Sequence, residues 1–341
     1  MAATPSVSIL ICTYQRAALL EETLAALGST TVPDACNVEL IVVDNNSSDH
    51  TADVVRRFAA HAPWPVKYTT ETSQGKSFAL NRGISMAQGD IIALTDDDVL
   101  PVKDWLVRIC DALTDPSVKF VFGKVLPRWE VMPPPELLVV KAHAIWGPLA
   151  LVDYGDELVR YDAEHFRDRR LPIGANLAIR RSAIEQVGGW RTDLGRVDNS
   201  LIAGEDRELC VRLYKSGLYK GLYDPKLVVR HFVPASRLTR RYFRRWFFWH
   251  GRTMARMAGA VYLDLDLDRV PFVLGVPRFV YRETLDQISR WLRCVGRTDA
   301  LALLINEVTL IEYAGFFAES WLRKRAPRSV KLQAQHDVVP N

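Results

Sequence analysis

Short apolar runs alternate with amphipathic stretches over the first 125 residues. The apolar runs predict β-strands at residues 6–12, 38–44, 66–70, 90–95 and 118–125. Helical spacing of apolar positions predicts helices between them, at residues 17–27, 49–61, 76–87 and 103–113. Continuously apolar strands that alternate with helices indicate an α/β fold with a mostly parallel sheet sandwiched by helices. Ligands of such sheets bind beyond the carboxyl ends of the strands.

The pattern changes after residue 125, where four prolines between positions 127 and 135 predict an irregular crossing. A further strand is expected at residues 173–179, with helices starting at 181 and spanning 205–216. From residue 238 onward, helices are expected at 238–257, 278–294 and 299–324. We therefore predict an α/β domain at residues 1–232, a helical region at 233–330 and a disordered tail at 331–341.

The composition is that of an ordinary globular protein, with 48% hydrophobic and 25% charged residues, which excludes disordered and collagen-like classes. The five cysteines include no CxxC pair, so they suit a reducing cytoplasm better than a disulfide scaffold or a zinc site. No basic segment precedes the first apolar run, and no uncharged apolar stretch reaches the ~18–20 residues of a membrane-spanning helix. We expect a cytoplasmic protein that is soluble or peripheral on the inner face of the cell membrane.

Positive charge is concentrated in one segment. The net charge is only +4, yet residues 230–256 hold eight arginines and no acidic residue, so the rest of the chain sums to −4. Six aromatic residues lie among the arginines of 237–256. This pattern fits a packed helix with a solvated basic face, a helix lying on an anionic membrane surface, or a stacking surface for nucleic acid. The mildly acidic remainder of the chain disfavours a nucleic-acid partner.

Three consecutive carboxylates, those of Asp96, Asp97 and Asp98, follow the predicted strand at 90–95. They repel one another, so a positive partner is expected. A helix cap would need only one Asp, whereas Mg²⁺ or Mn²⁺ takes one or two carboxylates together with phosphate oxygens. Polar residues also follow the first two strands: Thr13, Tyr14 and Arg16 after one, and Asp44, Asn45 and Asn46 after the other. Their convergence on one sheet edge predicts a nucleotide pocket.

Other candidate motifs are less decisive. Lys76 lies in a Gly-Lys-Ser sequence, but position 70 is Thr, so the segment is not a P-loop. Glu205 and Asp206 open a predicted helix, where carboxylates are favoured by the helix dipole, so a catalytic role and a helix-start role both remain open. His231 follows a short predicted strand and fits either a structural position or a ligand.

Together these segments resemble the family 2 glycosyltransferases of the GT-A fold, from about residue 6 to residue 251. The matching sequences, in chain order, are SILICTYQR, VVDNNSSDHT, QGKSFALNRGI, ALTDDD, IGANLAIRR, GGW, GEDREL and RHF. Their order and spacing carry the resemblance, since no single one is decisive. It implies a Rossmann-like GT-A domain with a helical C-terminal extension, and an inverting enzyme of the DxD type.

The resemblance also implies roles for individual residues. Nucleotide binding falls to Thr13, Tyr14, Arg16, Asp44, Asn46, Lys76, Asp96 and Asp97. Asp98 and His231 would bind a divalent cation, Mg²⁺ or Mn²⁺, and Asp97 occupies the middle position of the DxD element. The ED element makes Asp206 the general base, with Glu205 beside it.

The implied activity is transfer of a sugar from a nucleoside-diphosphate sugar, with a UDP-sugar expected, to a hydroxyl of a glycan or a lipid-linked acceptor. The pathway would be the synthesis of cell-surface polysaccharide or glycolipid. A sugar nucleotidyltransferase is one alternative, but it favours a Gly-rich loop where this chain has CTYQR. A catalytically silent module that binds sugar nucleotide or a membrane surface is another. Against it, positions 98, 206 and 231 carry the residues that catalysis would use.

Overall fold

The computed structural model describes residues 5–34, 36–162, 164, 166, 171–196, 200–257, 269–296 and 299–325. The chain forms two compact units. The first comprises Met1–Arg128, Ala150–Thr192 and Glu205–Phe232, and the second comprises Trp129–Leu149, Asp193–Gly204 and Val233–Asn341. The predicted tail at 331–341 lies outside the described residues.

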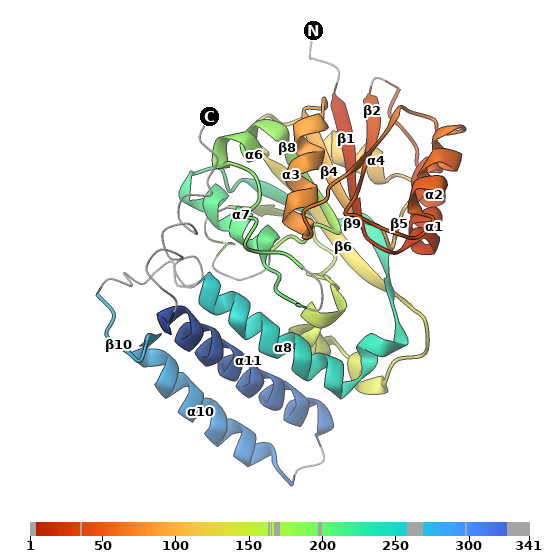
Figure 1. The fold of residues 1–341 in the computed structure, drawn as a ribbon. Helices are drawn as coiled ribbons and strands as arrows, with labels where there is room; N and C mark the ends of the chain where they lie inside the picture. The colour runs from red at the N-terminus through yellow and green to blue at the C-terminus, as the bar shows by residue number, and fades with distance from the viewer. Residues whose placement is uncertain are drawn as a thin grey trace. The chain divides into compact units, whose positions relative to one another are not determined.

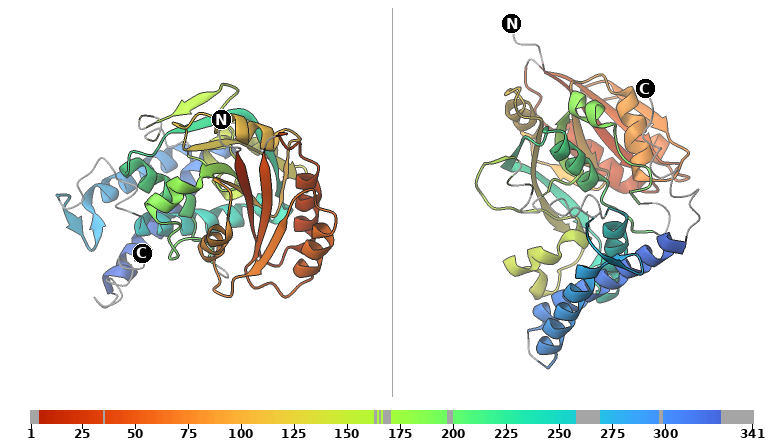
Figure 2. Two further views of the ribbon diagram at one scale, coloured as in Figure 1. Left: turned by 90° about the horizontal axis from the view of Figure 1, so that it is seen from above. Right: turned by 90° about the vertical axis from the view of Figure 1, so that its left-hand side faces the viewer.

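The first unit is built on a nine-stranded sheet in the order β3-β2-β1-β4-β8-β6-β9-β5, with β7 paired to β9 (Figure 1). The strands are β1 (Ser6–Thr13), β2 (Asn37–Asp44), β3 (Val66–Thr70), β4 (Ile91–Asp96), β5 (Val99–Pro101), β6 (Phe120–Trp129), β7 (Val159–Tyr161), β8 (Asn176–Arg180) and β9 (Gly221–Val233). The helices are α1 (Ala17–Gly28), α2 (Thr51–Ala59), α3 (Lys76–Met86), α4 (Trp105–Ala112), α6 (Arg181–Val187) and α7 (Glu205–Lys215). Helices α1 and α2 lie on one side of the sheet, and α3, α6 and α7 on the other (Figures 1 and 2).

The α/β fold and the parallel core of the sheet are confirmed. Strand β1 pairs in parallel with β2 and β4, and β2 with β3. Residues 40–43 of β2 are fully buried, which explains why these strands are apolar without alternation. The other half of the sheet is antiparallel, because β8 runs against β4 and β6, and β9 against β5 and β7. Strand β5, of three residues, was not expected from the sequence.

One buried amide joins the antiparallel half of the sheet. Asn176, 1% exposed, accepts a hydrogen bond from the indole of Trp105 at 2.9 Å. Its Nδ2 donates to the carbonyl oxygens of Lys124 and Leu227, each at 2.9 Å. Asn176 therefore connects β8 to α4, β6 and β9, and a side chain of another shape would leave buried polar groups without partners.

The second unit contains α8 (Arg240–Arg256), α10 (Arg278–Cys294), α11 (Ala300–Arg325) and a short hairpin of β10 (Phe272–Val273) and β11 (Val276–Pro277). It also holds the 3₁₀ helices η1 (Pro135–Leu137), η2 (Val140–Ile145), η3 (Gly147–Leu149) and η4 (Ala235–Leu238). Three of the helices match those expected after residue 238.

Helix α8, the basic and aromatic segment, packs tightly on α11. A Cβ atom at Gly251 would lie 1.8 Å from the carbonyl oxygen of Glu312, and one at Gly315 would lie 1.9 Å from that of Phe248, so only glycine permits this approach. Three α11 carboxylates pair with side chains of α8: Glu307 with Arg244, Glu312 with His250, and Glu319 with Arg252 and Arg256. Phe243 and Phe247 are buried. Of the three interpretations of this segment, helix packing is the one its contacts support.

Helix α11 is the longest apolar helix among the described residues. By length and composition, its residues Ala300–Arg323 could cross a membrane, with a mean hydropathy of 1.5 over an 18-residue window. The stretch is not uncharged, since it contains Glu307 and Glu312, so the expectation that no uncharged apolar stretch reaches that length is unchanged. Both carboxylates are paired with side chains of α8, so the two acidic residues within this apolar stretch have partners inside the second unit.

We expect Asn176→Ala to lower the free energy of unfolding by about 2–4 kcal/mol, because the indole N–H and two carbonyl groups lose their partner. Chemical denaturation measures this difference. The control is Asn37→Ala, at an exposed position where β2 begins. Equal stability of the two variants would contradict the role assigned to Asn176.

Candidate active site

The register of the parallel strands brings the predicted strand ends to one edge. Thr13 of β1 pairs with Asp44 of β2, and Cys12 pairs with Asp96 of β4. Three chain segments that are far apart in sequence therefore end side by side. The polar residues that follow these strands gather at the carboxyl edge of the sheet, where the sequence placed the pocket.

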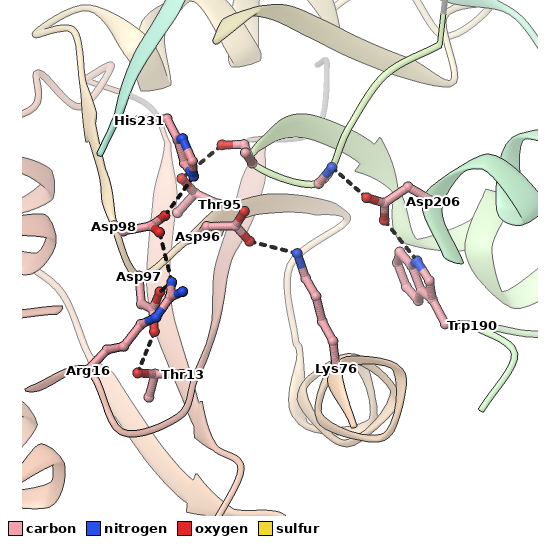
Figure 3. Close-up of polar contacts among 12 residues, drawn as sticks. Thr13, Arg16, Lys76, Thr95, Asp96, Asp97, Asp98, Trp190, Asp206 and His231 are labelled. Carbon is pink, nitrogen blue, oxygen red and sulfur yellow. Dashed lines mark hydrogen bonds and ion pairs between the residues drawn. The ribbon is translucent and has the colours of Figure 1, made fainter. Parts of the chain in front are cut away.

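Cations surround the three consecutive carboxylates (Figure 3). Nη1 of Arg16 lies 3.0 Å from Oδ1 of Asp97 and 2.7 Å from Oδ2 of Asp98. Thr13 donates its hydroxyl to Oδ2 of Asp97 at 2.8 Å, and Nζ of Lys76 lies 2.7 Å from Oδ1 of Asp96. Asp97 and Asp98 are buried, at 4% and 3% exposure. Burial raises the pKa of Asp97 to about 6, although the nearby Arg16 opposes the rise.

Lys76 is the first residue of α3 and stands between two groups of carboxylates. Burial alone would lower the pKa of Lys76, but the charges of Asp96, Asp206 and Glu205 raise it above its ordinary value. The ammonium group therefore stays protonated at neutral pH. It lies between the carboxylates of Asp96, Asp97 and Asp98, which we call the triple-aspartate edge or aspartate edge, and the carboxylates at the start of α7 (Figure 3).

Asn45 holds the loop that leads into Lys76. Its Oδ1 accepts a hydrogen bond from the backbone N–H of Gly75 at 2.7 Å. Its Nδ2 donates to the carbonyl oxygens of Glu71 and Ser73 at 3.0 and 2.8 Å. Gly75 has φ 141°, a backbone conformation that side-chain-bearing residues rarely adopt. This loop geometry fixes where α3 begins and hence where Lys76 stands.

The antiparallel pairing of β5 with β9 brings His231 to the aspartates. Val99 stands opposite His231, and the N–H of Phe232 donates to the carbonyl oxygen of Asp98 at 2.8 Å. Nε2 of His231 then lies 3.3 Å from Oδ1 of Asp98, with both side chains almost fully buried. The three-residue strand β5 was not predicted, so the residue pattern did not show how His231 reaches Asp98; only the family resemblance had assigned both residues to one cation.

These residues suit a divalent cation that is shared with a phosphate ligand. Within the described part of the chain, no group of three or more His, Cys, Asp or Glu side chains forms a complete metal cage. Mg²⁺ and Mn²⁺ do not require one, since they usually take one or two protein carboxylates and complete their shell with phosphate oxygens and water. The Asp98 oxygen and the His231 nitrogen are donors of the right type, side by side.

Asp206 lies across from the triple-aspartate edge, in the first turn of α7. Its Oδ2 accepts a hydrogen bond from the backbone N–H of Gly174 at 2.8 Å, and its Oδ1 accepts one from the indole of Trp190 at 3.3 Å (Figure 3). Trp190 is itself fixed, because Asn81 bonds both its backbone N–H and its carbonyl, each at 2.8 Å. Asp206 is thus oriented by backbone and indole rather than by a cation. Glu205, beside it, is buried.

The residues that were predicted to bind the nucleotide after β1 and β2 differ in how they are held. Asp44 is buried and accepts hydrogen bonds from the Tyr68 hydroxyl at 2.6 Å and from the Ser47 N–H at 2.8 Å. Burial and the bond to Asp44 raise the pKa of Tyr68 to about 12. Tyr14 is 45% exposed and Asn46 has φ 71°. Among the described residues, neither of these two side chains is hydrogen-bonded to the aspartates.

The structure therefore brings most of the predicted site residues together at one edge: Thr13, Arg16, Lys76, Asp96, Asp97, Asp98, Asp206 and His231. The sequence attached no positioning role to Asn45, Tyr68, Gly174 and Trp190. Asn45 was expected only as a polar residue at the pocket edge, and the strings VVDNNSSDHT, IGAN and GGW, which carried part of the resemblance, contain Asn45, Gly174 and Trp190.

Comparison with known proteins gives consistent matches. Residues 8–134 match the family described as "Glycosyl transferase family 2", and residues 91–256 match "Glycosyl transferase family group 2". "Glucosyl-dolichyl phosphate glucuronosyltransferase" of Haloferax volcanii is 28% identical over 66% of this chain and 68% of its own length. "Probable glycosyltransferase YdaM" of Bacillus subtilis is 30% identical over 63% of this chain, but the match spans only 48% of that protein.

A solved structure extends the likeness in fold to almost the whole chain. The mannosyltransferase PcManGT from Pyrobaculum calidifontis, determined in complex with GDP-Man and Mn²⁺, aligns over 98% of this chain and 80% of its own. The TM-score is 0.53 and the sequence identity 21%. The sheet, its flanking helices and the C-terminal helical extension are those of a GT-A fold.

We expect Lys76→Gln to lower the free energy of unfolding by about 1–3 kcal/mol, because the partly buried Asp96 loses its cation. The raised pKa of Lys76 means that its contribution is present below the pKa of unfolded lysine, ~10.4, and is lost only as pH rises through the folded value. The loss should therefore be constant from about pH 6 to pH 9. Urea titrations at several pH values test this, with Lys103→Gln, an exposed position, as the control. A loss no larger than that of the control would refute the assignment.

Proposed function

Because residues 8–134 match the model of glycosyl transferase family 2 and residues 91–256 match that of glycosyl transferase family group 2, we propose that this chain transfers a sugar from a nucleoside-diphosphate sugar to a hydroxyl of a glycan or lipid-linked acceptor, with inversion at the anomeric carbon. One observation carries the proposal. Thr95, directly before the three aspartates, donates to the carbonyl oxygen of Ala175 at 3.1 Å, and the N–H of the neighbouring Gly174 donates to Asp206 at 2.8 Å, which supports one shared site for the aspartate edge and Asp206 (Figure 3).

The carboxyl edge of the sheet is the donor side of this proposal. Thr13, Tyr14, Arg16, Asp44 and Asn46 follow β1 and β2 and would hold the nucleoside. The DxD element, Asp96 to Asp98, would face the diphosphate, with Arg16 and Lys76 available as cations beside it. Arg16 now binds two carboxylates, and on donor binding it could move its charge toward phosphate oxygens.

Asp98 and His231 would hold the divalent cation, Mg²⁺ or Mn²⁺, together with phosphate oxygens of the donor. When bound, such a cation offsets the negative charge that develops on a departing diphosphate. The chain itself positions the Asp98 oxygen and the His231 nitrogen, which the β5–β9 pairing holds side by side.

Asp206 is the proposed general base. A carboxylate has about four lone-pair positions, and Gly174 and Trp190 use two of them in Asp206. Among the described contacts, two lone-pair positions of Asp206 remain for an acceptor hydroxyl. The hydrogen bonds from Gly174 and Trp190 fix the orientation of the carboxylate. Asp206 takes the hydroxyl proton as the acceptor oxygen attacks the anomeric carbon. Attack from the face opposite the departing diphosphate inverts the configuration at that carbon. Glu205 adds negative charge beside the base.

The identities of the sugar donor and of the acceptor are a separate part of the proposal. We propose a UDP-sugar, although one structural neighbour was determined with GDP-Man. A lipid-linked acceptor is in keeping with the name of the Haloferax relative, a glucosyl-dolichyl phosphate glucuronosyltransferase. All five cysteines are free, which suits a site on the cytoplasmic face of the cell membrane, in polysaccharide or glycolipid synthesis.

We expect Asp206→Asn to lower kcat by about 100- to 10,000-fold while nucleotide affinity stays within about threefold, because only the proton acceptor is lost. Transfer is measured with a donor panel and glycan or lipid-linked acceptors, and affinity by calorimetry with nucleoside diphosphate. The matched control is Asp34→Asn, at an exposed position of the same unit.

Three other results would oppose the proposal. Full activity in Asp206→Asn would show that Asp206 is not the general base. Nucleotide binding without any transfer in the wild type would favour a silent binding module. Release of pyrophosphate from a nucleoside triphosphate and a sugar phosphate would favour a nucleotidyltransferase.

A further inference from the structure

Helix α10 exposes a stripe of large apolar side chains. Leu285, Ile288, Leu292 and Val295 are between 38% and 66% exposed. The spacing of Leu285, Ile288 and Leu292, three and four residues, places these three on one face of the helix, and Val295 follows directly after the end of the helix. The opposite face is covered, since Val280 is fully buried and Gln287 donates to Oδ1 of Asn306 on α11 at 2.9 Å. The stripe therefore points away from α11.

The β10–β11 hairpin extends this stripe. Phe272, Val273 and Leu274 are 50%, 45% and 60% exposed. The hydroxyl of Tyr281, in the first turns of α10, donates to the carbonyl oxygen of Val273 at 2.9 Å and holds the hairpin against the helix. At 100° per residue, Tyr281 falls within the arc of the stripe. Hairpin and helix thus present one apolar surface, which we name the α10 surface: residues 272–274, 285, 288, 292 and 295.

Arginines follow one side of the α10 surface. Arg278, Arg282 and Arg293 are exposed, and at 100° per residue they fall within about 80° of Leu285 on the side away from Ile288. An apolar stripe bordered by a row of arginines is typical of helices that lie in a membrane interface, where the arginines meet anionic headgroups. The charged residues of α10 also exclude that it spans a bilayer.

We propose that the α10 surface lies in the interfacial region of an anionic lipid bilayer. A second copy of the chain packed antiparallel through this face fits less well, because the two-fold axis would bring the arginine rows of the two copies together. Helix α8, the segment that the sequence offered for this role, buries Phe243 and Phe247 and pairs several of its arginines with α11. The proposal concerns where the chain is held and is independent of its catalytic activity.

Flotation of the full chain with vesicles tests the proposal. We expect binding to vesicles that contain phosphatidylglycerol, and at least tenfold weaker binding to pure phosphatidylcholine. The double variant Leu285→Gln/Leu292→Gln should bind phosphatidylglycerol vesicles at least tenfold more weakly. Arg282→Gln/Arg293→Gln should bind them about 25-fold more weakly, since each interfacial arginine contributes roughly fivefold. The control is Leu158→Gln, a similarly exposed leucine of the first unit, which should bind like the wild type.

Circular dichroism and light scattering of the same proteins separate the other outcomes. The substituted side chains are exposed, so the folded signal should be unchanged and the wild type should be monomeric without vesicles. A wild-type dimer that Leu285→Gln/Leu292→Gln converts to monomer would overturn the proposal in favour of self-association. Binding by all variants with wild-type affinity, or no binding by the wild type, would also overturn it.

Discussion

The repulsion among three neighbouring carboxylates is the constraint on which the site depends. Asp97 and Asp98 are buried at the end of a central strand, where an uncompensated charge is costly. The chain meets this cost with Arg16 from the loop after β1 and with Lys76 from the start of α3, while the β5–β9 pairing brings His231 to the same place. The loops at the carboxyl edge are positioned by this charge balance as much as by apolar packing.

The same balance leaves the site prepared for an anionic ligand. Each cation that now binds an aspartate is also a cation that phosphate oxygens can attract. Across the site, the hydrogen bonds that Asp206 accepts within the described part of the chain come from uncharged donors, the Gly174 N–H and the Trp190 indole. The two sides thus differ in chemistry: one is a dense array of paired charges suited to a diphosphate, and the other is a single oriented carboxylate suited to taking a proton.

The sequence predicted the parallel core well, because continuous apolar runs such as that of β2 have one natural place in an α/β sheet. It could not predict contacts made by short or distant segments. Strand β5 is too short to leave a pattern, so the pairing that brings His231 to Asp98 could not be predicted, although the family resemblance had assigned both residues to one cation. The bonds of Trp190 to Asp206 and Asn81 depend on tertiary folding alone. For α8, periodicity identified an aromatic face but not the helix α11 that covers it, nor the exposed α10 surface.

The central claim is that the aspartate edge binds the donor diphosphate with a divalent cation. Calorimetric titration of UDP and GDP into wild type and Asp98→Ala, with and without Mn²⁺, tests it without requiring an acceptor. The account predicts that one nucleotide binds the wild type only with Mn²⁺ and that Asp98→Ala binds it at least tenfold more weakly. Binding that needs no cation and is unchanged in Asp98→Ala would contradict it.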